Sequence, residues 1–343
     1  MPIKNRQVLL ASRPMGIPKV ENFRVAENEV PSLVSGQILL ENHYVSLDAG
    51  FRNWMNEGSG DDVLPEMQVD RPVMGLTLGQ VIDCKLSEYA PGEGLMVRKA
   101  WEEYSVLDAS HFISRLPEDR ECPLSYYLGI LGDTGLSAYF GLLDIGRPLK
   151  GQTVLVSAAG GAVGNVAGQI ARIMGARSVG ICGSKTKIDR LVDELGFDAA
   201  INYRMDDLDQ SIKKACPNGI DVYFDNVGGP LLEVVLDNIA VGARIVLCGS
   251  IISYNALEPV RGPSNLFQLT ARQATMQGFM THLQETRYEE ARKEITGWVK
   301  SGVLRNAEYR LTGINKVGQA FCDLFSGKNF GKTIVALKNS KEA

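Results

Sequence analysis

A short run of small residues, Ala159-Gly160-Gly161-Ala162-Val163-Gly164, has the A-x-G-x-x-G spacing of a turn that binds phosphate groups. Gly161 lets the backbone approach a pyrophosphate because it has no Cβ, and Gly164 lets the next helix lie close to the preceding strand. A helix that begins here directs free N–H groups and the positive end of its dipole at the phosphates. Ala159 stands where the usual fingerprint has its first glycine. A glycine-rich turn that binds nothing would explain the same residues, so the neighbouring segments decide between the two interpretations.

A cationic cluster follows the glycines by about 20 residues, where proteins that bind NAD place an Asp or Glu to accept both ribose hydroxyls. This chain has Ser184 there, followed by Lys185 and Lys187, with Arg190 beyond. Cations without a carboxylate fit a 2′-phosphate, which an acidic residue would repel. The alternative is an ordinary solvated helix start, but a lysine near a helix N-terminus opposes the dipole, and a bound anion explains it better. The pattern favours NADPH over NADH.

The elements that position these residues alternate along the chain. The run Thr153–Val156 predicts one buried strand, and apolar residues at helical spacing after Gly164 predict a helix. Alternation at this spacing is typical of a doubly wound parallel sheet with right-handed crossovers. The predicted later strands are 178–182, 199–202, 221–224, 244–248 and 275–279, and the predicted helices are 126–131, 136–143, 187–195, 208–215, 230–238 and 288–301.

The first 120 residues or so have another pattern, of short strands separated by Gly and Pro, which predicts a small, mainly antiparallel, barrel-like domain. Its predicted strands are 7–11, 36–44, 78–85, 95–100 and 103–107. Near the end of the chain the strand–helix alternation breaks, which indicates that the tail returns to the first domain. We therefore expect one domain from residues 1–125 and 305–343 and a second domain from residues 126–304.

Composition narrows the class of protein. A chain of 343 residues with 45% hydrophobic and 22% charged residues is typical of a globular protein with two domains. The net charge of −4 argues against nucleic acid or an anionic membrane surface as a partner. The first residues lack the apolar run of a signal peptide, so we expect a cytoplasmic protein. Six widely spaced cysteines without a C-x-x-C pair, and only three histidines, predict reduced thiols and no zinc site.

Several segments along the chain have distinctive motifs: Ser12-Arg13-Pro14-x-Gly16, Ser46-Leu47-Asp48 with Arg52, Gly135–Gly141, Ala158–Gly164, Tyr223–Gly229, Cys248–Asn255 and Gly327-x-Asn329-x-Gly331-Lys332. In these motifs the chain resembles the zinc-independent double-bond reductases of the medium-chain dehydrogenase/reductase superfamily, which include leukotriene B4 dehydrogenase/prostaglandin reductase, plant alkenal reductases and curcumin-reductase-like enzymes. The similarity runs nearly from end to end. Zinc-dependent members of the superfamily carry Gly-His-Glu where this chain has Gly75-Leu76-Thr77.

The resemblance implies a GroES-like, mainly-β barrel domain, a Rossmann domain that binds NADPH, and a homodimer. Lys187 and Tyr203 would hold the 2′-phosphate. Asn226 lies just past a strand, where a turn ahead of Gly228 would also explain it. Cys248 is interpreted as a small buried residue rather than a nucleophile, since no histidine lies nearby in sequence. The full set of expected cofactor contacts is Gly161, Ala162, Val163, Gly164, Lys187, Tyr203, Asn226, Cys248, Gly249, Ser250, Tyr254, Phe279, Met280, Thr281 and Asn329.

Tyr254 is the expected catalytic residue. Hydride addition to the β-carbon of an enone leaves negative charge on the carbonyl oxygen, and a hydroxyl donor there stabilises it. The matching tyrosine of the relatives is thought to do this, and a loop aromatic packed on the cofactor is the alternative. The chain departs from the family at Ala49-Gly50, where relatives carry Pro-Tyr, and at Asp133-Thr134, where they carry Met-Pro. We expect Gly50, Arg52, Asp133 and Thr134 at the substrate cleft, although a structural ion pair with Asp48 is favoured for Arg52.

The leading hypothesis is an NADPH-dependent reductase of the C=C bond in α,β-unsaturated ketones or aldehydes. A quinone reductase of the same superfamily and a non-catalytic NADPH-binding protein remain the alternatives. The segment 275–279 is predicted to be an edge strand, which could pair with a second copy across a twofold axis.

Overall fold

The computed structural model describes residues 2–205 and 207–337, and these form two compact units. Unit 1 contains the chain up to Leu128, Tyr309–Lys328 and the residues from Thr333 onward. Unit 2 contains Gly129–Glu308 and Asn329–Lys332. The boundaries differ by a few residues from those expected from the sequence. Residue 1 and residues 338–343, which the sequence analysis assigns to the first domain, lie outside the described part. The expected functions of the two domains, with substrate bound by the first and cofactor by the second, stay a prediction.

Unit 2 is built on a six-stranded sheet in which every strand pair is parallel, with the order β10-β9-β8-β11-β12-β13. The chain leaves the central strand β8 toward one edge and returns on its other side at β11, so the strand order reverses there. In open α/β sheets ligands bind at the carboxyl ends of the strands at this reversal. The strands are β8 (Thr153–Val156), β9 (Arg177–Cys182), β10 (Ala199–Asn202), β11 (Ile220–Asp225), β12 (Ile239–Leu247) and β13 (Thr275–Gly278).

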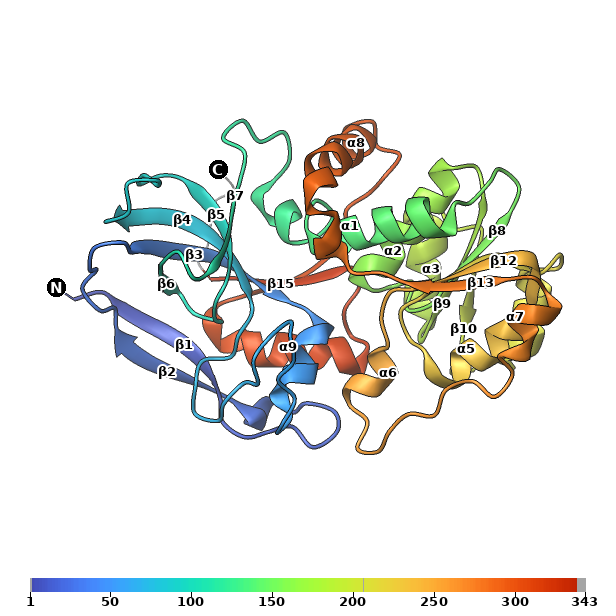
Figure 1. Cartoon of the computed structure of the whole chain (residues 1–343), viewed down its shortest axis with the longest axis horizontal. Coiled ribbons are helices and arrows are strands. Elements are labelled where there is room, and N and C mark those ends of the chain that lie inside the picture. Colours follow the sequence, from blue (N-terminus) through green and yellow to red (C-terminus); the bar gives the residue numbers. More distant parts are fainter. Residues whose placement is uncertain (1, 206, 338–343) are drawn as a thin grey trace. The chain divides into compact units, whose positions relative to one another are not determined.

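Helices lie on both faces of this sheet (Figure 1). The core between them is made of β-branched and other aliphatic side chains that the strands bury completely, such as Leu155, Val179 and Ile245. A π-helical turn continues α1 at Gly141–Gly146, and another continues α3 at Arg190–Glu194. The helices are α1 (Asp133–Phe140), α2 (Ala162–Ile173), α3 (Lys185–Asp189), α4 (Leu208–Ala215), α5 (Gly229–Leu236), α6 (Ile251–Tyr254), α7 (Phe267–Ala271) and α8 (Tyr288–Lys300).

Unit 1 is a barrel-like antiparallel structure around the long strand β3, which pairs with β4, β6 and β15. Its larger sheet has the order β14-β15-β3-β4-β5-β7, and β1 pairs with β2 in a separate ribbon. The strands are β1 (Lys4–Leu10), β2 (Phe23–Glu29), β3 (Ile38–Leu47), β4 (Leu76–Cys84), β5 (Gly94–Arg98), β6 (Tyr104–Leu107), β7 (Phe112–Arg115), β14 (Glu308–Thr312) and β15 (Lys332–Ala336).

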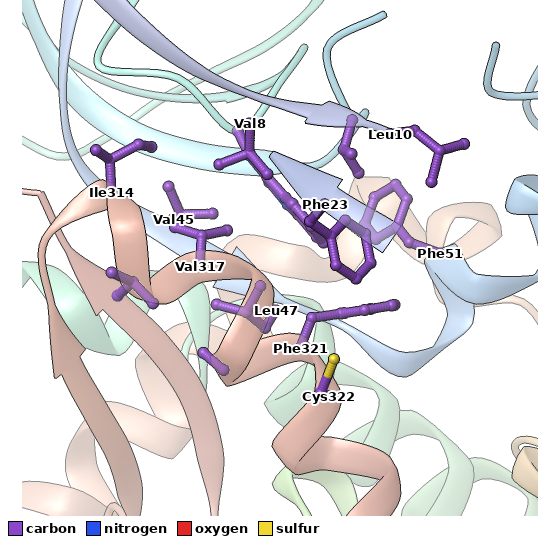
Figure 2. Close-up of a cluster of buried hydrophobic side chains, with 14 of the residues drawn as sticks. Val8, Leu10, Phe23, Val45, Leu47, Phe51, Ile314, Val317, Phe321 and Cys322 are labelled. Atoms are coloured by element: carbon purple, nitrogen blue, oxygen red, sulfur yellow. The ribbon is translucent and has the colours of Figure 1, made fainter. Parts of the chain in front are cut away.

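The core of unit 1 joins the two ends of the sequence. Helix α9 (Val317–Ser326) buries Phe321 against Phe23 and Trp101, with ring centroids 5.8 and 5.2 Å apart. Figure 2 shows Phe321 and Phe23 beside aliphatic side chains from β1 and β3. Because α9, β14 and β15 come from the last part of the chain, unit 1 is discontinuous in sequence.

The parallel sheet and the barrel-like unit confirm the fold class expected from the sequence. Several local expectations were wrong. The pattern analysis missed β2 and β7, whose exposed polar residues hide the alternation of a buried strand. The helix expected at 126–131 is a 3₁₀ turn at Leu124–Leu128. The helix expected at 187–195 begins earlier, because the Ser184 hydroxyl accepts a hydrogen bond from the Lys187 amide and so caps α3.

Candidate functional site

The glycine turn connects β8 to α2. Ala158 adopts a φ of +47°, and the amide of Gly161 donates a hydrogen bond to the Ala158 carbonyl at 2.8 Å. A Cβ at Gly164 would lie 2.5 Å from that same carbonyl oxygen, so only glycine fits there. Ala162 and Val163 begin α2, and their N–H groups have no acceptor within the helix. The turn therefore presents backbone donors at a helix N-terminus, which is the geometry that a pyrophosphate requires.

The alanine at the first position of the motif has a physical reason. Ala159 is fully buried, and its amide donates to the Ile181 carbonyl of the neighbouring strand at 3.0 Å. Its methyl group lies 2.9 Å from the place that a Cβ of Gly180 would occupy. Gly180 on β9 thus supplies the room that a glycine at position 159 supplies in the usual fingerprint.

Lys187 lies over this turn. Its Cδ atom is 3.1 Å from the position of a Cβ at Gly160. Burial is the main cause that lowers the pKa of the Lys187 ammonium; Cys182 opposes this shift and the positive charge of Arg204 adds to it. Within the part of the chain that the structure describes, no carboxylate contributes to the pKa of Lys187. A partly buried cation with this environment is stabilised by a bound anion.

The other two cations of the cluster already have partners. Lys185 pairs with Asp189 at 2.9 Å, and Arg190 pairs with Glu194 at 2.9 Å. Arg190 also stacks on the ring of Phe330, with its Cζ 3.9 Å from the ring centroid. The structure therefore separates Lys187 from the rest of the cluster that the sequence grouped together.

Tyr203 follows β10 and lies beside Gly183 at the end of β9. Its Oη would be 3.0 Å from a Cβ at Gly183, and its side chain is 49% exposed, so a ligand can reach the ring. Arg204 donates from Nε to the Tyr203 Oη at 3.3 Å. The sequence analysis missed Arg204, because its place beside Gly183 follows from the parallel pairing of β9 with β10 and not from spacing along the chain.

Asn226 lies at the carboxyl end of β11 and is tied to β8. Its Nδ2 donates to the Ser157 carbonyl at 2.8 Å, and its amide donates to the Ser157 hydroxyl at 2.8 Å. The buried Asp225 holds the turn that follows, because its Oδ1 accepts from the amides of Val227 and Gly228 at 2.9 Å each. The hydrogen bonds to Ser157 thus give Asn226 a structural role at the end of β11, and its contact with a cofactor stays a prediction.

The segment after β12 lies on the same edge. The amides of Cys248 and Gly249 donate to the Asp225 carbonyl at 2.9 and 3.1 Å. The Tyr254 hydroxyl accepts from the Ser250 amide at 3.3 Å, and burial raises the pKa of this hydroxyl, so it stays protonated at neutral pH. Burial and, secondarily, the charge of Asp225 raise the pKa of the Cys248 thiol to about 12. A thiol that stays protonated is a poor nucleophile, although Cys248 is partly exposed and so is not the fully buried residue that was expected.

A strap from the end of the chain closes over the glycine turn. The amide of Gly331 donates to the Gly160 carbonyl at 2.9 Å, and Gly161 forms an isolated parallel bridge with Gly331. Asn329 is buried two residues earlier, and its Nδ2 donates to the Gly331 carbonyl at 3.4 Å. The structure thus brings Asn329 beside the phosphate-binding turn, although 165 or more residues separate them in sequence.

The segment after β13 meets α1. Thr281 Oγ1 lies 2.6 Å from Ser137 Oγ, and the Phe279 ring lies 2.7 Å from the position of a Cβ at Gly141. Met280 between them is 48% exposed. These contacts fix the segment against unit 2 and leave its expected contact with the cofactor a prediction.

The four residues expected at the substrate cleft lie in different environments. Gly50 belongs to the 3₁₀ segment Ala49–Met55, and a Cβ placed there would meet nothing within 4 Å. Asp133 is the exposed first residue of α1, and the Thr134 hydroxyl donates to the Gly129 carbonyl at 3.0 Å. Gly50 belongs to unit 1, whereas Asp133 and Thr134 belong to unit 2.

Arg52 is 2% exposed and is held by neutral groups. Its Nη1 donates to Asn56 Oδ1 at 2.7 Å, and its Nη2 donates to the Pro14 carbonyl at 2.8 Å and the Gly16 carbonyl at 3.1 Å. Burial lowers the pKa of its guanidinium. The expected ion pair with Asp48 is therefore not what anchors Arg52; this side chain fixes the loop around Gly16, and a contact with substrate stays a prediction.

A surface cavity of about 390 Å³ lies at the amino ends of β11 and β12, lined in part by Lys213, Asn238 and Arg272. The glycine turn follows the carboxyl end of β8, so this cavity is separate from the candidate site.

Among the described residues, no group of three or more His, Cys, Asp or Glu side chains could hold a metal ion. No helix in the described ranges has the length and apolar character needed to cross a bilayer. Each of the six cysteines is free, with four buried and two partly exposed.

Comparison with known proteins agrees with this arrangement. Residues 6–114 match the family model described as the N-terminal domain of oxidoreductase, and residues 162–296 match the model described as zinc-binding dehydrogenase. The chain is 36% identical to the NADPH-dependent curcumin reductase of Escherichia coli, covering 97% of this chain and 96% of that protein. It is 35% identical to the NADP(+)-dependent 2-alkenal reductase of Nicotiana tabacum, covering 97% of each. A Bacillus subtilis protein assigned as an NADP-dependent oxidoreductase is 41% identical over 99% of both chains.

A solved structure, CurA from Vibrio vulnificus in complex with NADPH, superimposes with a TM-score of 0.90 at 37% identity, covering 97% of this chain and 99% of that chain. The resemblance expected from the sequence is thereby confirmed. The chain belongs to the medium-chain dehydrogenase/reductase family, in the branch that contains the curcumin, alkenal and prostaglandin reductases.

Proposed function

We propose that this protein binds NADPH along the carboxyl edge of the unit 2 sheet and reduces the C=C bond of α,β-unsaturated ketones or aldehydes. The observation that carries the proposal is the glycine turn at the start of α2, with Lys187 lying over it and no carboxylate at the Ser184 position. The names of the relatives support it, since they include NADPH-dependent reductases of curcumin and of 2-alkenals.

The residues present fit this cofactor. The backbone amides from Gly161 to Gly164 would hold the pyrophosphate, because a Cβ at Gly164 would fill the space that the turn needs. Lys187 and Tyr203 would hold the 2′-phosphate at the ends of β9 and β10. The ends of β11 and β12, with the strap at Asn329, would hold the nicotinamide half. When bound, NADPH supplies the hydride.

The contribution of the chain to the reaction is positioning and electrostatic stabilisation. The Tyr254 hydroxyl accepts its hydrogen bond from the Ser250 amide, so its own proton is available to a substrate oxygen. Its raised pKa keeps that proton in place at neutral pH. Negative charge that develops on the carbonyl oxygen during hydride transfer would be stabilised by this donor. The proton that completes the reaction at the α-carbon comes either from solvent or from Tyr254.

The test compares two substrate classes on the same purified protein. NADPH consumption is followed at 340 nm with trans-2-hexenal and with 9,10-phenanthrenequinone, at equal concentrations and in parallel. The proposal predicts faster turnover of the alkenal. Much faster turnover of the quinone would assign a quinone reductase instead, and no turnover of either, with NADPH still bound, would favour a binding protein. The homodimer and the cytoplasmic location expected from the sequence stay predictions.

A further inference from the structure

The ends of β9 and β10 form a small surface where the side chains of Tyr203 and Arg204 meet the backbone of Gly183. Asn202 pairs with Cys182, and the Tyr203 amide donates to the Cys182 carbonyl at 3.1 Å. This pairing places Tyr203 and Arg204 directly beside Gly183, which follows β9. Lys187 belongs to α3, which begins two residues after Gly183. The surface thus draws on two strand ends next to the start of one helix.

Gly183 lies directly beside the side chains of Tyr203 and Arg204. A Cβ at Gly183 would lie 2.8 Å from Tyr203 Cε1, 3.0 Å from Tyr203 Oη and 3.1 Å from Arg204 Nε. The contact of 2.8 Å with Tyr203 Cε1 is closer than real Cβ atoms come to other atoms. Any other residue at position 183 would therefore displace the tyrosine, the arginine or both. Glycine at this position lets the two side chains lie close to the backbone.

Arg204 is oriented by Tyr203. Its Nε donates to the Tyr203 Oη at 3.3 Å, and its Cζ lies 5.6 Å from the centroid of the tyrosine ring. The backbone of the same residue is fixed as well, because the Arg204 amide donates to Asn202 Oδ1 at 3.1 Å. Nη1 and Nη2 are donors distinct from Nε and lie in the plane of the guanidinium. This fork is suited to bind two oxygens of one phosphate.

Arg204 and Lys187 also affect each other. Burial is the main cause that lowers the pKa of Lys187, and the charge of Arg204 lowers it further, so the two cations lie within electrostatic reach of each other. Two positive charges held together repel each other unless an anion lies between them. An anion with close to two negative charges, such as a phosphomonoester, reverses that repulsion.

We propose that Arg204 is a second cationic ligand of the 2′-phosphate of NADPH, and that it grips this phosphate together with Lys187 and the Tyr203 hydroxyl. The inference rests on the proposed cofactor and extends it to a residue that determines the preference for NADPH over NADH. The competing interpretation is that Arg204 is a surface residue that only supports the Tyr203 ring.

The experiment measures dissociation constants by isothermal titration calorimetry for NADPH, NADH and adenosine 2′,5′-bisphosphate. The variants are Arg204→Gln and Lys187→Gln, with Lys185→Gln as the matched control. Lys185 is a lysine of the same helix, but it is exposed and pairs with Asp189. Arg204 is also exposed, so its replacement should leave the fold intact, and NADH binding reports on the rest of the site in each variant.

Arg204→Gln is expected to weaken the binding of NADPH and of adenosine 2′,5′-bisphosphate by about tenfold, the effect of one lost charge-assisted hydrogen bond. Its NADH affinity is expected to change by less than about twofold, and Lys185→Gln to leave all three ligands within about twofold. Unchanged NADPH affinity in Arg204→Gln would overturn the inference. An equal loss for NADPH and NADH would also overturn it and assign Arg204 a supporting role for the adenosine.

The result for the unaltered protein distinguishes a failure of the proposed cofactor preference from a failure of the role proposed for Arg204. If it binds NADPH no more tightly than NADH, the proposed cofactor preference fails and Arg204 loses its assigned ligand. If it prefers NADPH and Arg204→Gln keeps that preference in full, only the role of Arg204 fails.

Discussion

Gly164→Ala tests the geometry of the phosphate-binding turn. The added methyl group would lie 2.5 Å from the Ala158 carbonyl oxygen and 2.9 Å from the Ala159 Cα. Both neighbours are backbone atoms, so the turn itself has to move. Overpacking of this kind costs about 1–3 kcal/mol, and rigid neighbours place it at the upper end. The replacement of glycine within a helix recovers about 0.5–1 kcal/mol, so we expect a net loss of about 2 kcal/mol.

The assay combines thermal unfolding with calorimetric titration of NADPH. A loss of about 2 kcal/mol lowers the melting temperature of a unit of this size by about 4–8 °C. NADPH affinity is expected to fall by more than about tenfold, because the displaced amides no longer converge on the pyrophosphate. The matched control is Gly297→Ala in α8, where a Cβ meets nothing within 4 Å and the same substitution should raise stability by about 0.5–1 kcal/mol. The reasoning is refuted if Gly164→Ala is as stable as the unaltered protein and binds NADPH within a factor of two.

Three further predictions concern neighbouring residues of unit 2. Ala158→Gly relieves a left-handed backbone at a φ of +47° and should stabilise the protein by about 0.5 kcal/mol with NADPH affinity kept; a lower midpoint in urea unfolding would contradict this. Tyr254→Phe should reduce turnover of an enal by about tenfold or more while the NADPH dissociation constant stays within about twofold, and unchanged turnover would remove Tyr254 from the mechanism. Cys248→Ala should keep turnover within about twofold, and iodoacetamide at pH 8 should leave Cys248 unmodified because its pKa is about 12; rapid alkylation would show a reactive thiolate.

Sequence patterns predicted the central part of unit 2 well, for physical reasons. Strand β8 and the start of α2 lie where the apolar run and the glycines place them, because a buried strand needs a continuous apolar run and the close approach at Gly164 excludes other residues. The doubly wound sheet followed from the alternation of strands and helices. These features are local in sequence, so local patterns carry them.

Features that depend on contacts between distant segments were not predictable in the same way. Arg204 lies at the site because β9 and β10 pair in parallel, and its sequence context is an ordinary charged loop. The hydrogen bond from Gly331 to Gly160 joins the end of the chain to the glycine turn, which no spacing rule foresees. Arg52 was grouped with Asp48 by proximity in sequence, whereas the fold surrounds it with the carbonyls of Pro14 and Gly16.

The central claim is that hydride from NADPH is delivered to the β-carbon of an enal or enone. The direct measurement is the position of the label when NADPH carrying two deuterium atoms at C4 is supplied with trans-2-hexenal and the product is examined by NMR. The account predicts hexanal with one deuterium at its β-carbon. Deuterium at the carbonyl carbon, in an allylic alcohol that keeps its double bond, would contradict it.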